Sequence, residues 1–301
     1  MAEVSFENRT VIVTGAGNGL GKAYALDLGS RGAKVVVNDL GGAVDGSGSG
    51  STPADEVANE IVSNGGEAVA NYDSVATKDG AESIVQTAID NFGTVDAVIN
   101  NAGILRDKSF ANMSEEELSL IIDVHLKGTF FVSQSAFRVM KENSYGRIVN
   151  VASPSGLFGN FGQSNYGAAK MGIVGLTNVL AIEGAKYNIK VNVIAPTAYT
   201  RMTEALLPED VGKLFSAELV TPMVSYLASE ACEPSHEIFG VAAGRFARIG
   251  IITHKGYVNT TASAEDIADN IEEIRNIENG TYPLSNEDEL MIIQQAIQGN
   301  Q

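Results

Sequence analysis

The sequence contains little cysteine, no tryptophan and fewer positive than negative charges. Its 301 residues include one cysteine, Cys232, so no internal disulfide bond can form, as is usual in a reducing compartment. Cys232 lies between Glu230 and Glu233, whose charges oppose a thiolate, and we do not expect it to act as a nucleophile. The formal net charge of −17 argues against a nucleic-acid partner, because nucleic-acid binding requires a basic surface.

Targeting, membrane and metal signals are also missing. No apolar run reaches the length needed to span a membrane, and the N-terminus lacks the basic and apolar stretches of a leader. The C-terminal Gly-Asn-Gln is not a peroxisomal address. We therefore expect a cytoplasmic protein without membrane insertion. The histidines, His125, His236 and His254, lack metal-ligand spacing, so we expect no metal site.

Short β-branched runs alternate with helical patterns along most of the chain. This alternation predicts an α/β fold with a doubly wound parallel sheet and helices on both faces. We expect one domain over residues 1–245. Residues 246–301 are expected to form a helical extension rather than an independent domain. The predicted strands are Thr10–Thr14, Lys34–Asp39, Glu67–Asn71, Val95–Asn100, Arg147–Val151, Lys190–Ala195 and Phe239–Gly244.

A glycine-rich turn, Thr14–Lys22, joins the first predicted strand to a helical pattern. Glycines in such a turn let the backbone approach a pyrophosphate, and the helix N-terminus offers free N–H groups and a positive dipole. A plain turn is the alternative, but the strand-to-helix context favours a dinucleotide site.

Asp39 ends the second predicted strand, about twenty residues after the first glycines. A carboxylate in this position is typical of contact with the ribose 2′-hydroxyl of NAD. Leu40, next to Asp39, and Asn18, in the glycine turn, offer no arginine or lysine to a 2′-phosphate, so NAD is favoured over NADP. A helix or turn cap is the alternative for Asp39. The glycine- and serine-rich loop that follows, residues 40–53, is interpreted as a flexible flap or a surface insertion.

Tyr166 and Lys170 are four residues apart in a helical pattern, so their side chains share one helix face. Ser153 stands upstream, at the end of an apolar strand, where open α/β sheets bind ligands. We expect the Lys170 ammonium to lower the pKa of the Tyr166 phenol from about 10, while Ser153 holds a reacting oxygen. An amphipathic helix with an interfacial tyrosine is the alternative.

Four further expectations concern the rest of the chain. One long helix is predicted over Asp123–Glu142, and Pro196 is expected to end its strand, because proline cannot extend a central strand. A short helical lid is predicted over Glu204–Ser216. The extension is expected to contain two helices, about Ala264–Glu278 and Glu287–Gln298.

Four landmarks in this order resemble the short-chain dehydrogenase/reductase family: the glycine turn, Asn100-Asn-Ala-Gly103, Ser153 and Tyr166-x-x-x-Lys170. The resemblance covers roughly residues 5–245 and implies a seven-stranded Rossmann fold, a nicotinamide cofactor and oxidation of an alcohol or reduction of a ketone. It implies that Tyr166 is the acid/base, that Ser153 orients the substrate oxygen, and that Lys170 holds the nicotinamide ribose. The cofactor residues that it implies are Gly15, Asn18, Gly19, Leu20, Gly21, Asp39, Asp73, Ser74, Asn101, Tyr166, Lys170 and Thr200.

Two positions depart from the family pattern. Most members have asparagine where this chain has His125, at a place that helps to hold a proton-relaying water. His125 is interpreted either as a fourth catalytic member or as a packed helix histidine. Members usually have Pro-Gly after the sixth strand, whereas this chain has Pro196-Thr197 and one residue fewer before Thr200.

Shorter segments, such as Val36–Gly42 and Gly159–Gln163, resemble a subfamily, the dehydrogenase unit of peroxisomal multifunctional enzymes of type 2. The resemblance implies NAD-dependent oxidation of 3-hydroxyacyl-CoA in β-oxidation of fatty acyl or steroid side chains, here in a stand-alone form. It also implies a homodimer or homotetramer. The alternatives are a hydroxysteroid or other secondary-alcohol dehydrogenase, and a non-catalytic NAD-binding module.

Overall fold

The computed structural model describes residues 4–203 and 212–298. The chain divides into two compact units, Met1–Arg248 and Ile249–Gln301. No described helix is both long enough and apolar enough to cross a membrane.

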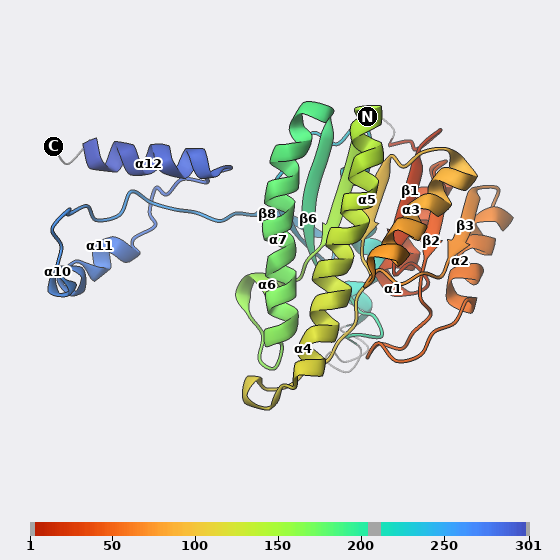
Figure 1. Cartoon of the computed structure of the whole chain (residues 1–301), viewed down its shortest axis with the longest axis horizontal. Helices are drawn as coiled ribbons and strands as arrows, with labels where there is room; N and C mark the ends of the chain where they lie inside the picture. Colours follow the sequence, from red (N-terminus) through yellow and green to blue (C-terminus); the bar gives the residue numbers. More distant parts are fainter. Residues whose placement is uncertain (1–3, 204–211, 299–301) are drawn as a thin grey trace. The chain divides into compact units, whose positions relative to one another are not determined.

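The first unit is built on one twisted sheet whose strand order is β3-β2-β1-β4-β5-β6-β7-β8 (Figure 1). Strands β1 to β7 pair in parallel, which confirms the predicted doubly wound sheet. The strands are β1 (Thr10–Thr14), β2 (Lys34–Asn38), β3 (Glu67–Asn71), β4 (Ala97–Asn100), β5 (Gly146–Val151), β6 (Ile189–Thr197), β7 (Ile238–Ala242) and β8 (Arg245–Ile249).

Helices cover both faces of this sheet. Alternate strand residues point to opposite faces, so Val11 and Val13 pack in a core with α1, α2 and α9, while Ile12 packs in another with α3, α5 and α7. The main helices are α1 (Gly19–Ser30), α2 (Thr52–Ser63), α3 (Lys78–Phe92), α4 (Glu115–Ile121), α5 (Gly128–Asn143), α6 (Pro154–Phe158), α7 (Ser164–Gly184) and α9 (Thr221–Ala228).

The sheet has eight strands in the described part of the chain, one more than the seven expected. The additional strand is β8, which follows β7 at the edge of the sheet. Ala243 and Gly244 join the two strands, and both have positive φ, as in a two-residue hairpin turn. The residues of β8 are mostly exposed, so they lack the apolar pattern that identified the other strands.

Pro196 does not end its strand, contrary to expectation. The strand β6 continues to Thr197, and Pro196 pairs with Val241 of β7. The pairing of β6 with β5 ends at Ile194, so β6 has a neighbour on one side only at Pro196. A proline without an N–H is tolerated there, because no strand on the other side requires that donor.

The predicted long helix over Asp123–Glu142 is divided into two parts. Residues Ile122–Lys127 form a π-helical segment, η2, and the α-helix α5 begins at Gly128. Single π-helical turns occur often at functional sites, and this one contains His125.

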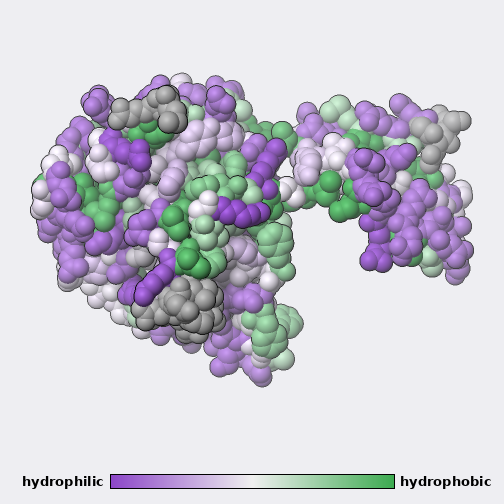
Figure 2. Space-filling view, turned by 180° about the vertical axis from the view of Figure 1, so that it is seen from behind, coloured by the Kyte–Doolittle hydropathy of each residue, from purple (hydrophilic) through white to green (hydrophobic). Residues whose placement is uncertain are grey.

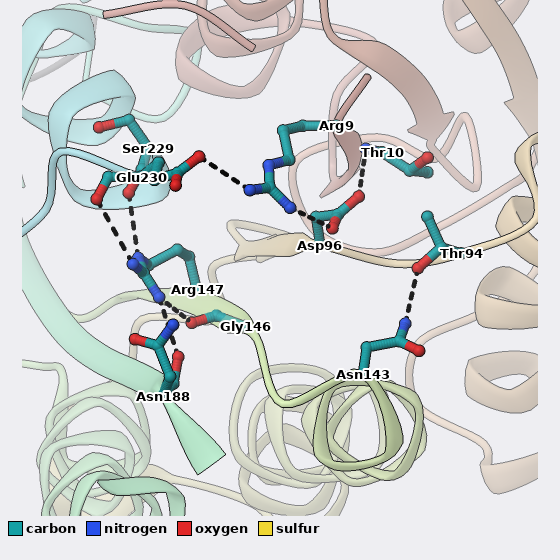
Figure 3. A network of polar contacts seen from close by, with 10 residues as sticks. All are labelled: Arg9, Thr10, Thr94, Asp96, Asn143, Gly146, Arg147, Asn188, Ser229 and Glu230. Atoms are coloured by element: carbon teal, nitrogen blue, oxygen red, sulfur yellow. Dashed lines mark hydrogen bonds and ion pairs between the residues drawn. The ribbon is translucent and has the colours of Figure 1, made fainter. Parts of the chain in front are cut away.

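A polar network closes the edge of the sheet where the parallel strands begin (Figure 3). Arg9 forms ion pairs with Asp96 and Glu230, at 3.1 and 2.8 Å. Arg147 is 2% exposed and donates hydrogen bonds to the carbonyl oxygens of Gly146, Asn188, Ser229 and Glu230. The network therefore ties β5 to the loops that precede β6 and follow α9.

The second unit contains α10 (Ala264–Asp269), α11 (Ile271–Arg275) and α12 (Asn286–Gln298). The first predicted helix of the extension is thus two helices, which meet at Asn270. Several apolar side chains of this unit are exposed, including Ile277 at 60% and Met291 at 52%, and Figure 2 shows apolar patches among its hydrophilic residues.

Candidate active site

A cavity of about 450 Å³ lies at the carboxyl ends of the parallel strands, on the edge opposite the Arg147 network. Parallel strands bring their carboxyl ends to one edge, which is why residues from distant parts of the sequence meet here. With the exception of Gly21, all the predicted site residues line it: Gly15, Asn18, Gly19, Leu20, Asp39, Asp73, Ser74, Asn101, His125, Ser153, Tyr166, Lys170 and Thr200.

The glycine turn forms one wall of this cavity. Gly15 has φ +62°, and a Cβ there would lie 2.7 Å from the Cα of Ala102. A Cβ on Gly21 would overlap the carbonyl oxygen of Gly15, so this glycine supports the turn from behind rather than lining the cavity. The following helix α1 has no side-chain cap and no acid in its first turn. Its free N–H groups suit an anionic ligand.

Asp39 lies beside that turn and is fixed by the backbone. One carboxylate oxygen accepts the N–H of Gly17 at 2.8 Å, and the other accepts the N–H of Gly41 at 2.7 Å. The alternative interpretation, a turn cap, therefore describes part of its role. A carboxylate has about four acceptor positions, so both oxygens can still receive hydrogen bonds from a ligand hydroxyl.

The loop after Asp39 is not a free flap. Ala43 N–H donates to Ser47 at 2.8 Å, and Gly50 N–H donates to Leu40 at 2.9 Å. Val44 accepts the backbone N–H of Leu105 at 2.9 Å. The loop thus lines the cavity and is joined to the segment that follows β4.

Asn38 and Asn71, which were not predicted as site residues, both form hydrogen bonds with Asp73. Asn38 donates to the side chain of Asn71 at 2.8 Å and to the carbonyl oxygen of Asp73 at 2.9 Å. Asn71 donates to the carboxylate of Asp73, which also accepts from Ser83. Each asparagine is the polar last residue of an otherwise apolar strand end, and this was the feature of the sequence that could have predicted them as site residues. These bonds hold Asp73 at the cavity wall.

Asn101 joins the end of β4 to the glycine turn. Its side-chain amide donates to the carbonyl oxygens of Thr14 and Gly15, both at 3.0 Å. Its backbone N–H donates to the hydroxyl of Thr14 at 3.1 Å. The side chain therefore links the end of β4 to the end of β1 and to the glycine turn.

Ser153, Tyr166 and Lys170 converge at the other end of the cavity. Ser153 follows β5 and caps α6, where its hydroxyl accepts the N–H of Ser155 at 3.2 Å. Tyr166 lies in the first turn of α7, and Lys170 lies one turn later. Lys170 is 3% exposed, and its Nζ donates to the carbonyl oxygen of Val151 at 2.7 Å and lies 5.4 Å from the centroid of the Tyr166 ring.

The expected low pKa of Tyr166 is wrong for this structure. Burial raises the pKa of the phenol to about 12, a hydrogen bond with Ser153 lowers it in part, and the charge of Asp107 raises it. Burial likewise lowers the pKa of Lys170 to about 7. Helical spacing places the two side chains on one face, but it does not reveal that Lys170 is buried and that Tyr166 is partly buried at the cavity wall.

His125 packs directly against the tyrosine. Its ring lies 5.1 Å from that of Tyr166, edge to face, and its Nε2 lies within hydrogen-bond distance of the N–H and carbonyl oxygen of Ile104. Nδ1 is buried with no partner among the described residues. Burial and then the charge of Lys170 hold the pKa of His125 well below its usual value, so the ring is neutral.

Thr200 lies close to the glycine turn in the cavity lining. A Cβ on Gly19 would lie 3.4 Å from the Thr200 methyl group. The Thr200 hydroxyl accepts the N–H of Met202 at 3.2 Å. Most of the predicted lid over Glu204–Ser216 lies outside the described residues, and its described end contains one 3₁₀ turn, Lys213–Phe215.

Comparison with known proteins adds sequence evidence. Residues 9–210 match the family model described as short chain dehydrogenase. A short-chain type dehydrogenase/reductase of Mycobacterium tuberculosis is 52% identical over 263 residues, which are 87% of this chain and 92% of that protein. Peroxisomal multifunctional enzyme type 2 of Mus musculus is 50% identical over 284 residues, which are 92% of this chain but 38% of the mouse protein.

Two solved structures have the same fold. Full-length peroxisomal multifunctional enzyme type 2 from Drosophila melanogaster superposes with a TM-score of 0.83 and 36% identity, over 98% of this chain and 50% of that one. A 7α-hydroxysteroid dehydrogenase in complex with NADH and 7-oxo glycochenodeoxycholic acid gives a TM-score of 0.73 and 26% identity, over 81% and 98% of the two chains. The chain thus spans half or less of these multifunctional enzymes.

Proposed function

This chain belongs to the short-chain dehydrogenase/reductase family, and we propose that it oxidises the secondary alcohol of a 3-hydroxyacyl-CoA to the ketone with NAD. Membership of the family, and relatives that are named dehydrogenases, make it an oxidoreductase. The cofactor, the substrate and the roles of individual residues are our proposal. The observation that carries it is one cavity with an uncapped helix N-terminus at one end and Ser153, Tyr166 and Lys170 at the other.

The residues present fit a nicotinamide dinucleotide. The first turn of α1 offers free N–H groups to the pyrophosphate, and Asp39 offers acceptors to the adenosine ribose. Lys170 uses one of its three N–H groups on Val151 and can donate the others to ribose hydroxyls. We assign the adenine side to Asp73 and Ser74, the central region to Asn101 and the carboxamide to Thr200, with the bound nicotinamide supplying the hydride acceptor.

The chain's own residues handle the proton of the substrate hydroxyl. Ser153 donates a hydrogen bond to the reacting oxygen and holds it beside Tyr166, which removes the proton. A protonated Lys170 stabilises the phenolate, because an opposite charge nearby favours the ionised form. Hydrogen bonds from Lys170 to ligand hydroxyls favour its ammonium form and so oppose the effect of burial. His125, neutral and packed on Tyr166, is assigned to support the ring.

Replacing Tyr166 with phenylalanine tests the chemistry. We expect turnover, followed as NADH absorbance, to fall by about 10²- to 10⁴-fold, because general acid–base catalysis contributes rate factors of that order. The Kd for NAD should change little, since the ring remains. A Tyr166→Phe enzyme with wild-type turnover contradicts the assignment.

Asp39 tests the choice of cofactor. The charge of Asp39 repels a 2′-phosphate, so Asp39→Asn, which keeps one acceptor oxygen, is expected to raise the ratio of NADP to NAD efficiency about tenfold. The matched change Asp79→Asn in α3, whose side chain is not in the cavity lining, controls for lost net charge. An unchanged ratio in Asp39→Asn contradicts the proposal.

The substrate class rests on the resemblance to the dehydrogenase unit of the multifunctional enzymes, of which this chain spans half or less. A second candidate, a hydroxysteroid or other secondary-alcohol dehydrogenase, is favoured by the likeness to the 7α-hydroxysteroid enzyme. Comparing kcat/KM for each enantiomer of a 3-hydroxyacyl-CoA with that for a free hydroxysteroid separates the two. NAD binding with no NADH production from either substrate would instead indicate a binding module.

A further inference from the structure

Asn165, which directly precedes Tyr166 in α7, is a buried side chain that the proposed chemistry does not use. It is 1% exposed. Its amide group donates to the carbonyl oxygens of Arg106 at 3.0 Å and Glu117 at 3.1 Å. Its side-chain oxygen accepts the backbone N–H of Tyr166 at 2.7 Å. One side chain therefore joins the catalytic helix to two other parts of the chain.

The bond to Tyr166 concerns the backbone that carries the phenol. The first N–H groups of a helix have no partner within the helix, and Tyr166 is the third residue of α7. The N-cap residue of α7, Gln163, makes no side-chain capping bond. Asn165 thus supplies the partner that the N–H of Tyr166 would otherwise lack.

The bonds to Arg106 and Glu117 set the position of that helix end. Arg106 belongs to a segment, residues 104–107, whose first two residues line the cavity and whose other members are also hydrogen-bonded. Ile104 is hydrogen-bonded to His125, and Leu105 is hydrogen-bonded to Val44 of the loop after β2. Asp107 accepts from Gln163 at 2.7 Å. Asn165 therefore binds a segment that is itself held by hydrogen bonds, and both N–H groups of its side-chain amide are used.

We propose that Asn165 is a positioning residue, whose side-chain amide holds the Tyr166 hydroxyl in reach of Ser153. The proposal rests on the proposed function, since it assumes that Tyr166 is the acid/base. Without the amide, the carbonyl oxygens of Arg106 and Glu117 lose a buried donor, and the first turn of α7 is free to shift. A displacement of about 1 Å at a reacting group can lower the rate about 10²-fold.

Asn165→Ala tests this directly. We expect kcat to fall about 10- to 100-fold, while the Kd for NAD stays within about threefold, because the residue does not line the cavity. Asn165→Ser, which is smaller but polar and cannot reach both carbonyls, is expected to lie between Ala and wild type. It also serves as the decisive variant should Asn165→Ala fail to fold.

The pH profile separates positioning from mere stability. The hydrogen bond with Ser153 lowers the pKa of Tyr166, so a displaced phenol ionises at higher pH. We expect the rising limb of kcat/KM against pH to move upward in Asn165→Ala. Asn143→Ala, which removes one side-chain bond to Thr94 at the opposite edge of the sheet, is the matched control and should leave kcat and the pH profile unchanged.

Wild-type kcat and pH profile in Asn165→Ala, or in Asn165→Ser where the first does not fold, would overturn the proposal. This failure is distinct from failure of the proposed function. An active Tyr166→Phe enzyme removes the acid/base assignment itself. An inactive Tyr166→Phe enzyme together with a fully active Asn165 variant removes only the positioning role.

Discussion

Lys170 offers the sharpest test of the electrostatics of the site. Its ammonium is buried and donates a hydrogen bond to the carbonyl oxygen of Val151. Burial lowers its pKa from the ordinary 10.5 to about 7. Replacing Lys170 with methionine keeps an unbranched side chain of similar length and removes the charge.

The size of the effect follows from these two pKa values. The pKa of this lysine is 10.5 in the unfolded chain and about 7 in the folded one, so the unfolded chain binds the proton more tightly. Each pKa unit of difference corresponds to about 1.4 kcal/mol of binding free energy. Between these pH values the unfolded state carries the additional proton, so the free energy of unfolding rises with pH. From pH 7 to pH 10 the gain from this one group is between about 3 and 4 kcal/mol, because Lys170 in the folded state is still half protonated at pH 7.

Urea unfolding of the protein without added cofactor, at pH 7, 8 and 9, measures this gain. We expect the wild type to become more stable relative to Lys170→Met by about 1 kcal/mol per pH unit. Above pH 10 the stability of both proteins is expected to fall with pH, because burial raises the pKa of Tyr166 and Tyr24 and the unfolded tyrosines ionise first.

Lys78→Met is the control, since it removes a lysine whose side chain is 60% exposed. The same stability difference between wild type and Lys170→Met at all three pH values refutes the reasoning. Such a result would mean that Lys170 reaches water in the protein without cofactor.

Two other changes test the packing at the opposite edges of the sheet. Gly21→Ala is expected to raise the Kd for NAD about tenfold or more, because the new methyl group would overlap the carbonyl oxygen of Gly15. Gly175→Ala is its control, since a Cβ there would have no described atom within 4 Å. Equal affinities of wild type and Gly21→Ala in calorimetric titration would contradict the expectation. Arg147→Met is expected to lower the free energy of unfolding by about 3 kcal/mol, because buried carbonyl oxygens lose their donors, without changing the Kd for NAD. A stability loss in urea unfolding no larger than that of Asn143→Ala would show that the Arg147 network is dispensable.

Local patterns predicted much of the fold correctly. The strand runs and the glycine turn depend on a few neighbouring residues, and their order along the chain implies a doubly wound sheet. The convergence of Asp39, Ser153 and Tyr166 also followed from sequence, because parallel strands place their carboxyl ends at one edge. The strand β8 was missed because its mostly exposed residues carry no apolar alternation.

Pro196 shows how a correct local rule failed in context. Proline does exclude a donor, but the neighbouring β5 ends before it, and no pattern within β6 reveals where another strand stops. The same limit applies to Asn165, which looks like an ordinary helix residue. Two of its hydrogen-bond partners, Arg106 and Glu117, are distant in the sequence and approach it only in the folded chain.

The sequence by itself determined which groups are available for chemistry: a serine, a tyrosine and a lysine at helical and strand-end spacings, and a carboxylate after the second strand. These are properties of single residues and of regular periodicity. Only the tertiary structure decided how strongly each group holds its proton. The pKa values of Tyr166, Lys170 and His125 depend on burial, and burial is set by packing between segments far apart in the chain.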